Sequence, residues 1–296
     1  MLNALIVIAG PTGVGKSDLA IRLAEAVRGE IVNYDSIQIY RGFDIGSAKP
    51  SAADRERVPH HLFDIVDADE EFNAADYARF AALTCEEIAS RGRRAVFAGG
   101  TFFYLRAFLA GLPKMPGRNP QIRERLRRIA PARLHRWLSK VDPQSGRKIA
   151  PADRHRVERA LEVWIAAGRP ISSWEHAVEE IPSIKIALSL ERPSLVAALD
   201  RRVDAMYANG LVEETLQLLG RFPRSARPFG AIGYAEAVSV VMEERTLEEA
   251  VAETRRRTRA YAKRQMTWLR AERNVHWVDA GDPEKALEVA LRLIEV

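Results

Sequence analysis

The chain has 296 residues, of which 47% are hydrophobic and 29% charged, as in an ordered globular protein rather than a disordered one. Its length predicts a core domain with additional structure attached to it. No apolar run approaches the roughly 18 residues of a membrane-spanning helix, and the apolar segment Leu5–Ala9 lacks the basic leader and cleavage site of a signal peptide. Cys85 is the only cysteine, which excludes an intrachain disulfide and a cysteine-based zinc site, so we expect a cytoplasmic protein without membrane attachment.

The net charge of +5 is unevenly distributed. Residues 1–113 include 12 basic and 15 acidic side chains. Residues 114–175 include 15 basic and 6 acidic side chains, and residues 176–296 include 18 basic and 19 acidic side chains. The middle segment, with a net charge of +9, therefore carries all of the excess positive charge. It is either a solvated helical surface or a surface that attracts the phosphate backbone of a nucleic acid.

Short apolar runs predict buried parallel strands at Leu5–Ala9, residues 30–33 and residues 95–98. Apolar residues at helical spacing predict helices over residues 17–27 and 73–90. Strands that alternate with helices indicate a parallel α/β sheet with right-handed connections.

The pattern changes at residues 111–120, where proline and glycine are typical of a domain boundary. From residue 121 to about 176 the chain is basic and helical, without a good strand. Residues 184–190 alternate in polarity and predict a strand that returns to the core. Helices are expected next, at residues 194–209, 212–219 and 247–271, and then a last strand at 275–278.

The strongest local motif is Gly10, four further residues, Gly15, Lys16 and Ser17, directly after a predicted strand and at the start of a predicted helix. This is the pattern of a phosphate-binding loop, or P-loop, in its required context. Backbone N–H groups and the helix N-terminus bind phosphate, Lys16 reaches its oxygens, and Ser17 ligates Mg²⁺. The expected fold is a P-loop α/β core with a parallel sheet flanked by helices, over residues 1–113 and 182–296, plus a mainly helical, basic insertion over 114–181.

Alone, the P-loop would indicate an ATP-binding kinase or ATPase. However, the strand at 95–98 ends in Gly99, Gly100 and Thr101 instead of the aspartate that usually holds magnesium in such enzymes. Because ligands of open α/β sheets bind at the carboxyl ends of strands, the P-loop, Asp35 and Thr101 should converge there. Asp35 could instead cap the segment that follows it, and Thr101 could cap a helix at Phe102–Leu109.

Eight motifs, in order along nearly the whole chain, resemble those of the tRNA dimethylallyltransferase family of bacterial type. They are GPTGVGKS (10–17), NYDSIQIY (33–40), DIGSAKP (44–50), PHHL (59–62), GGT (99–101), DRHRVERALE (153–162), GAIGY (230–234) and YAKRQMTWLR (261–270). Only the first is specific by itself, but the set is highly specific. Eukaryotic relatives carry a C-terminal zinc finger, which a chain with one cysteine is not expected to form.

The resemblance implies transfer of a dimethylallyl group from dimethylallyl diphosphate to the exocyclic N6 amine of the adenosine 3′ of the anticodon in tRNA. It implies that Asp35 is the base and that Arg202, with Lys16, stabilises the departing diphosphate. Arg202 could otherwise be an exposed helix charge. The resemblance implies three catalytic residues, Asp35, Thr101 and Arg202. The diphosphate-binding residues that it implies are Gly10, Thr12, Gly13, Gly15, Lys16 and Ser17, with Mg²⁺ as cofactor at Ser17. The tRNA contacts that it implies are Asp35, Ser36, Ile37, Gln38, Thr101, Arg123, His155, Arg156, Val157, Glu158 and Arg159.

Gly230 and Ala235 depart from the family pattern, which leaves RNA contacts from this loop open. A row of basic residues at helical spacing, including Arg259 and Lys263, fits a solvated face or an RNA contact equally well. The pair His60-His61 is expected to form structural hydrogen bonds rather than a metal site.

Three other functions remain as alternatives: a small-molecule ATP-dependent kinase, a non-catalytic RNA-binding protein, and a prenyltransferase that acts on adenylate. The missing strand-end aspartate counts against the kinase, and the basic insertion counts against an adenylate substrate. A monomer is expected.

Overall fold

The structure is a computed structural model that describes residues 4–174 and 180–295. These residues divide into two compact units: residues 4–109 with 180–295 belong to unit 1, and residues 110–174 belong to unit 2. The last part of the helical stretch expected up to residue 176 lies outside the described residues.

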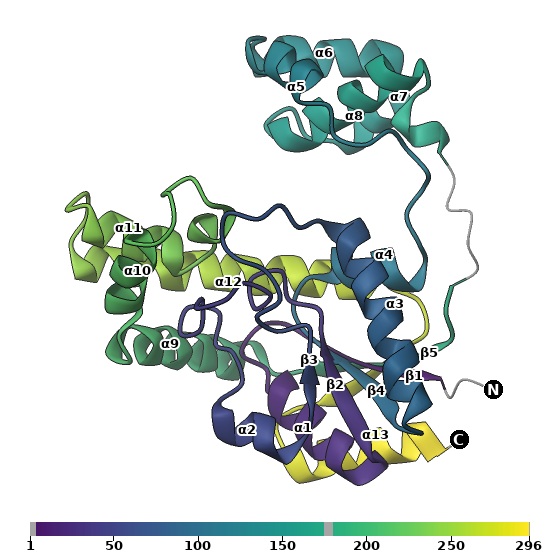
Figure 1. Ribbon diagram of the computed structural model, residues 1–296, viewed down its shortest axis with the longest axis vertical. Coiled ribbons are helices and arrows are strands. Elements are labelled where there is room, and N and C mark those ends of the chain that lie inside the picture. Colours follow the sequence, from purple (N-terminus) through teal and green to yellow (C-terminus); the bar gives the residue numbers. More distant parts are fainter. Residues whose placement is uncertain (1–3, 175–179, 296) are drawn as a thin grey trace. The chain divides into compact units, whose positions relative to one another are not determined.

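A six-stranded, fully parallel sheet forms the centre of unit 1, in the order β3-β2-β4-β1-β5-β6 (Figure 1). This confirms the predicted fold class. Ala98 lies opposite both Ile8 and Asn33, so the carboxyl ends of three neighbouring strands meet at one edge of the sheet. The strands are β1 Leu5–Ala9, β2 Gly29–Asn33, β3 His60–His61, β4 Arg94–Ala98, β5 Ser183–Ser189 and β6 Val275–Asp279.

Helices cover both faces of this sheet because its central strands are apolar on both sides. Helix α1 (Lys16–Val27) and helix α13 (Pro283–Glu295) pack on the face that carries Ile6 and Ile8. Helix α3 (Ala74–Ser90) and helix α4 (Phe102–Leu109) cover the other face, where Phe97 stacks on Phe108 at 5.1 Å between ring centroids. The P-loop is therefore the turn between a fully buried strand and the helix that packs on it.

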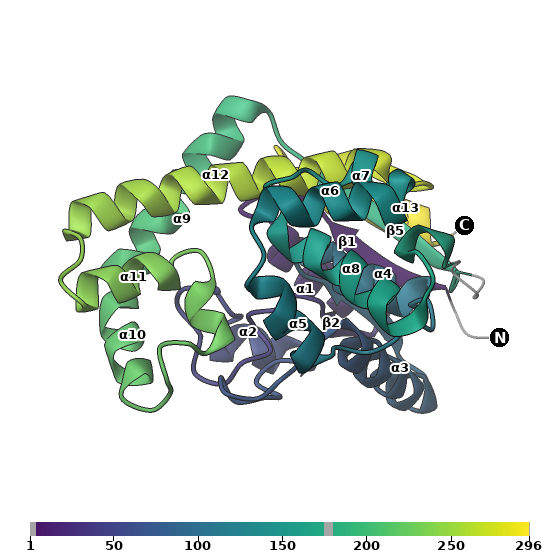
Figure 2. The same ribbon diagram turned by 90° about the horizontal axis from the view of Figure 1, so that it is seen from above.

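The remaining helices of unit 1 lie beside the sheet, and α12 is the longest of them (Figures 1 and 2). Helix α12 packs against α9 and α11, and near its end Trp268 stacks on Phe102 at 4.6 Å. This contact ties the helical layer to α4. The helices are α2 Ala52–Arg57, α9 Arg192–Ala208, α10 Leu211–Leu219, α11 Tyr234–Val241 and α12 Leu247–Ala271, with 3₁₀ turn η2 at Arg227–Gly230.

Five strands and six helices of unit 1 were predicted, and their ends differ from the structure by at most two residues. Helices α2, α11 and α13 and the two-residue strand β3 were not predicted. The strand expected at residues 184–190 is confirmed as β5. Lys185 in this strand is only 7% exposed and makes ion pairs of 2.6 Å with Glu180 and Glu272. The strand lies between β1 and β6, and its residues from Lys185 to Leu188 are continuously buried.

Unit 2 is helical in its described residues, and proline and capping side chains fix where its helices begin. Pro120, Pro131 and Pro143 occupy the first turns of three helices, where the missing N–H carries no penalty. Asp153 caps the fourth by accepting the N–H of Arg156. The elements are α5 Pro120–Arg127, α6 Pro131–Val141, α7 Pro143–Lys148, α8 Arg154–Ala167 and the 3₁₀ turn η1 Ile171–Ser173.

Candidate active site

The P-loop follows β1 and forms the N-terminus of α1. Gly13 and Gly15 have φ angles of 76° and 97°, a region that disfavours any other residue. Gly10 serves packing, because a Cβ there would lie 3.0 Å from the carbonyl oxygen of Leu188. The P-loop therefore requires glycine at two positions for backbone conformation and at a third for close packing.

Lys16 is half-buried at the base of the P-loop. Its Nζ donates to the carbonyl oxygen of Pro11 at 2.8 Å. Burial, together with the nearby charge of Arg202 and against the opposing effect of Asp35, lowers the pKa of Lys16 to about 7. Burial also lowers the pKa of Arg202, again with Asp35 acting in the opposite direction. A half-buried pair of cations favours an anionic ligand.

Asp35 lies just after β2, at the edge of the sheet where the P-loop begins. Its Oδ1 accepts the N–H of Ile37 at 2.9 Å, so the capping role considered above is real. Its Oδ2 is close to the backbone of Gly100, where an added Cβ would approach to 2.9 Å. At Gly99 an added Cβ would lie 2.8 Å from the backbone nitrogen of Asp35. The two glycines after β4 thus let that loop pack directly against the carboxylate.

The other residues expected near Asp35 surround it. The Thr101 hydroxyl donates to Ser36 Oγ and accepts the Ser36 N–H, both at 3.0 Å, so it joins the loop after β4 to the loop after β2. Gln38 donates to the carbonyl oxygens of Ser47 and Ala48 at 3.0 and 3.1 Å. Arg202, on α9, donates to the same Ser47 oxygen at 3.4 Å and is half-buried, which excludes an ordinary exposed charge.

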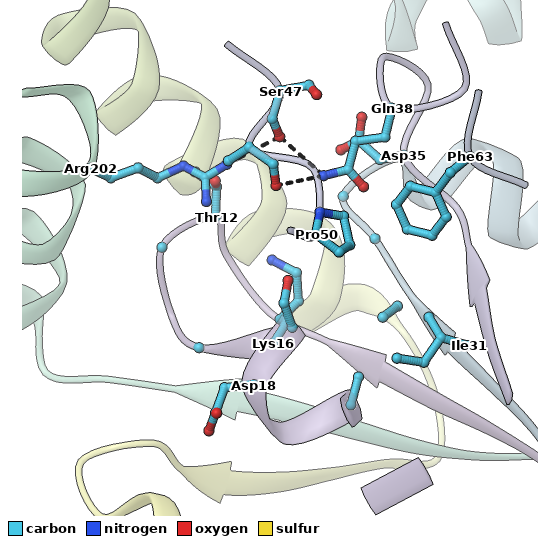
Figure 3. A pocket seen from close by; sticks show the side chains of 18 of the residues that line it. Thr12, Lys16, Asp18, Ile31, Asp35, Gln38, Ser47, Pro50, Phe63 and Arg202 are labelled. Carbon is cyan, nitrogen blue, oxygen red and sulfur yellow. Dashed lines mark hydrogen bonds between the residues drawn. The ribbon is translucent and has the colours of Figure 1, made fainter. Parts of the chain in front are cut away.

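A cavity of about 330 Å³ lies between these groups and contains the whole turn from Thr12 to Ser17 except Val14 (Figure 3). Arg202 enters from one side, and Ile31, Pro50 and Phe63 form an apolar wall on the other. The cavity therefore has a cationic, phosphate-sized part and an apolar part.

A second cavity of about 290 Å³ shares Thr12, Asp35, Ser47, Arg202 and Tyr261 with the first. Its other walls come from loop 36–37, from the turn at Gly230–Ile232 and from the α12 residues Thr254 and Thr258. Asp35 stands where the two cavities meet.

Three side chains at this junction were not assigned a role from the sequence: Ser47, Tyr261 and Gln265. All three lie in motifs at 44–50 and 261–270 that were noted only as part of the resemblance. Gln265, Tyr261 and the backbone carbonyl of Ser47 form hydrogen bonds with residues more than 150 positions away, so no local pattern reveals them. Arg264, also from α12, lines the second cavity with its guanidinium 5.6 Å from the Tyr261 ring centroid.

In unit 2, two of the basic residues expected to contact tRNA also hold a buried carboxylate. Glu162 is fully buried and accepts from Arg123 through two bonds of 3.0 Å, from Arg159 at 2.7 Å and from the Asn119 N–H at 2.6 Å. Although burial acts to raise the pKa of Glu162, these hydrogen bonds hold it below its ordinary value. Arg123 and Arg159 are therefore structural in unit 2.

The side chain of Val157, which the resemblance places among the tRNA contacts, is 1% exposed and belongs to the core of unit 2 with Leu161. Glu158 pairs with Arg154 at 2.5 Å and is also largely buried. His155 and Arg156 are exposed in the first turn of α8. The exposed part of the expected contact set is thus limited to these two residues.

The two adjacent histidines bond to protein groups. His60 Nδ1 lies 2.8 Å from the carbonyl oxygen of Val58, and His61 Nε2 lies 2.7 Å from Glu30 Oε2. Among the described residues, no three His, Cys, Asp or Glu side chains are grouped so as to hold a metal ion. None of the helices described is long and apolar enough to cross a membrane.

Comparison with known proteins identifies the family. The model of the IPP transferase family matches residues 38–272. The chain is 46% identical to tRNA dimethylallyltransferase 1 of Citrifermentans bemidjiense and 44% identical to tRNA dimethylallyltransferase of Geobacter sulfurreducens, covering 93% of this chain each time and 92% and 91% of the relatives.

Solved structures agree with these relatives. The tRNA isopentenylpyrophosphate transferase of Bacillus halodurans superposes with a TM-score of 0.74 at 36% identity, covering 99% of this chain and 97% of that one. A eukaryotic dimethylallyltransferase acting on tRNA gives a TM-score of 0.80 at 28% identity, covering 98% and 78%. The chain belongs to the IPP transferase family.

Proposed function

We propose that this protein transfers a dimethylallyl group from dimethylallyl diphosphate to N6 of the adenosine 3′ of the anticodon in tRNA. The observation that carries the proposal is the junction of two cavities at Asp35, one lined by a P-loop and the other large enough for a nucleobase. The family relationship supports the same reaction, because the named relatives are tRNA dimethylallyltransferases.

The first cavity receives the prenyl diphosphate. Its phosphates lie against the N–H groups of the P-loop, with Lys16 and Arg202 as cationic partners. The five-carbon group lies against the apolar wall of Ile31, Pro50 and Phe63. This arrangement matches a substrate with one highly charged end and one apolar end.

The protein groups fit a Mg²⁺ ion that arrives with the diphosphate. Mg²⁺ keeps several waters and binds substrate phosphates, so it needs only one or two protein oxygens. Ser17 lines the cavity at the start of α1 and would hold the ion. When bound, Mg²⁺ would neutralise charge that develops on the departing diphosphate.

The second cavity receives the adenine. An adenine in the anticodon loop must leave its stack to reach an enzyme pocket. The loop at Ser36 and Ile37 and the turn at Gly230–Ile232 form the walls against which it would lie. Arg264 at this cavity would bind a neighbouring phosphate, and the exposed His155 and Arg156 of unit 2 would contact the tRNA elsewhere.

The reaction joins N6 of adenosine to C1 of the prenyl group while the bond from C1 to the diphosphate oxygen breaks. The electron pair of that bond leaves with the diphosphate, whose charge Lys16 and Arg202 stabilise. N6 is a poor nucleophile because its lone pair is delocalised into the ring. Asp35 Oδ2 therefore accepts the N6 proton as the new bond forms. Thr12 and Thr101 lie at this centre, Thr12 in both cavities and Thr101 in the second.

The alternatives explain less of this arrangement. A kinase needs a phosphoryl acceptor and usually a carboxylate for magnesium at the end of a strand next to β1, but β4 is followed by Gly99 and Gly100. A non-catalytic RNA-binding protein has no need of a half-buried lysine and arginine beside a P-loop. We propose that the enzyme works as a cytoplasmic monomer.

The proposal is tested with purified protein, unmodified tRNA, dimethylallyl diphosphate and Mg²⁺. The tRNA is then digested, and the nucleosides are weighed by mass spectrometry. The proposal predicts a five-carbon addition to one adenosine next to the anticodon, with release of one diphosphate for each product. Consumption of ATP in a parallel reaction, without prenylated adenosine, would favour the kinase.

A further inference from the structure

Gln265 on α12 joins the two loops that carry opposite halves of the proposed reaction. Its Oε1 accepts the backbone N–H of Thr12 in the P-loop at 2.8 Å. Its Nε2 donates to the carbonyl oxygen of Gly100, in the loop after β4, at 3.1 Å. The side chain is only 3% exposed, so water does not compete for these bonds.

The bond to Thr12 removes one N–H group from the phosphate-binding set. Thr12 N–H points to Gln265 and not into the turn that would hold the diphosphate. Thr12 lines both cavities, whereas Gly13 and Gly15 line only the first. Gln265 therefore holds the P-loop at the point where the phosphate cradle ends and the reaction centre begins.

The hydrogen bond from Gln265 to Gly100 helps to position Asp35, the proposed base. An added Cβ at Gly100 would lie 2.9 Å from Asp35 Oδ2 and 3.1 Å from Gln265 Nε2, so the carboxylate, the glycine and the amide are in close contact. Tyr261, one turn earlier on α12, also donates to the Gly100 carbonyl oxygen, at 2.8 Å. The position of Asp35 is thus coupled to α12 through the backbone of Gly100.

Helix α12 gives these bonds a rigid support. Leu269, one turn beyond Gln265, is 2% exposed, and Trp268 stacks on Phe102 with an interplanar angle of 6°. Residues held by packing keep a reactive geometry better than residues on free loops.

We infer that Gln265 is a positioning residue that sets the distance between the P-loop, which holds the leaving group, and Asp35, which takes the proton. The inference rests on the proposed function. An amide is needed because the position requires an acceptor toward Thr12 and a donor toward Gly100. A carboxylate offers no donor to Gly100, and an apolar side chain offers neither partner.

The test uses two variants that keep the volume of the side chain, Gln265→Met and Gln265→Glu, with the exposed Gln217→Ala as a matched control. Single-turnover and steady-state rates are measured with saturating tRNA and varied dimethylallyl diphosphate. We expect kcat to fall about 100-fold for Gln265→Met, as for a misplacement of reacting groups by about 1 Å. The KM for the diphosphate should stay within about threefold, because the phosphate contacts are unchanged.

The two variants and the hydroxyl deletion Tyr261→Phe separate positioning from general damage. Gln265→Glu keeps the bond to Thr12 and should lower kcat less than Gln265→Met, and Tyr261→Phe should lower it least because Gln265 still holds Gly100. Unchanged kcat in Gln265→Met, or a raised KM with unchanged kcat, would overturn the inference. If the unaltered protein itself gave no prenylated adenosine, the proposed function would fail and not merely this assignment.

Discussion

Replacing Gly100 by alanine should displace the proposed base while leaving both substrates able to bind. The new Cβ would lie 2.9 Å from Asp35 Oδ2 and 3.3 Å from the Tyr261 hydroxyl. Ordinary contact begins near 3.4 Å, so the carboxylate must move by about 0.5 Å. Because a misplacement of about 1 Å in an active site can cost about 100-fold in rate, half that distance should lower kcat about tenfold. This corresponds to about 1.4 kcal/mol of lost transition-state stabilisation.

The assay is steady-state prenyl transfer with the KM of each substrate measured separately. Gly281→Ala is a suitable control because an added Cβ there meets nothing nearer than 3.4 Å. Alanine lowers the conformational entropy of the unfolded chain relative to glycine, which favours the folded state by about 0.4–1 kcal/mol. The melting temperature of the variant should therefore change little. Full kcat in Gly100→Ala, with the fold intact, would show that Asp35 tolerates this displacement and would refute the reasoning.

Three further predictions concern the diphosphate, the prenyl group and the tRNA. Since the pKa of Lys16 is about 7 in the free protein, its charge is present below that pH and lost above it, so affinity for inorganic pyrophosphate should fall by up to about tenfold per pH unit above pH 7. Calorimetric titration should show this slope, and Lys16→Arg should abolish the part due to the lysine; an identical slope in the variant would contradict the assignment. Phe63→Ala should open the apolar wall and so admit a longer prenyl chain. In competition assays, the rate with geranyl diphosphate relative to that with dimethylallyl diphosphate should rise by about tenfold. An unchanged ratio of the two rates would place the prenyl group elsewhere. Arg156→Ala should reduce the slope of log affinity for tRNA against log salt by about 0.7–0.9, while an unaltered slope would exclude a phosphate contact there.

Features with a local cause were predictable from the sequence. The P-loop is a continuous motif between an apolar strand and a helix, and strands β1, β2 and β4 are short apolar runs with glycine at one end, so both were located to within two residues. The helix starts in unit 2 follow from proline and capping residues in the same way.

Features that depend on tertiary contact were not predictable. The bond from Thr12 to Gln265 spans 253 positions, and the bond from Ser36 to Thr101 spans 65. The burial of Lys185 likewise depends on carboxylate partners outside its strand, Glu180 and Glu272.

Val157 illustrates a different limit. The resemblance placed Val157 among the tRNA contacts, whereas its spacing from Leu161 along α8 is that of a core face. Local periodicity alone predicts the burial of this side chain. Arg123 and Arg159 show the converse, because nothing in their spacing reveals that both bind the buried Glu162.

The most direct test of the proposed mechanism, in which Asp35 is the base, is single-turnover prenyl transfer by Asp35→Asn. The amide keeps the shape of the carboxylate and its bond to the Ile37 N–H but cannot accept the N6 proton. The account predicts that turnover falls by about 10²–10⁴, as for loss of a general base, while the dissociation constant for tRNA stays within about threefold. Turnover equal to that of the unaltered protein, with tRNA binding retained, would contradict the assignment of Asp35 as the base.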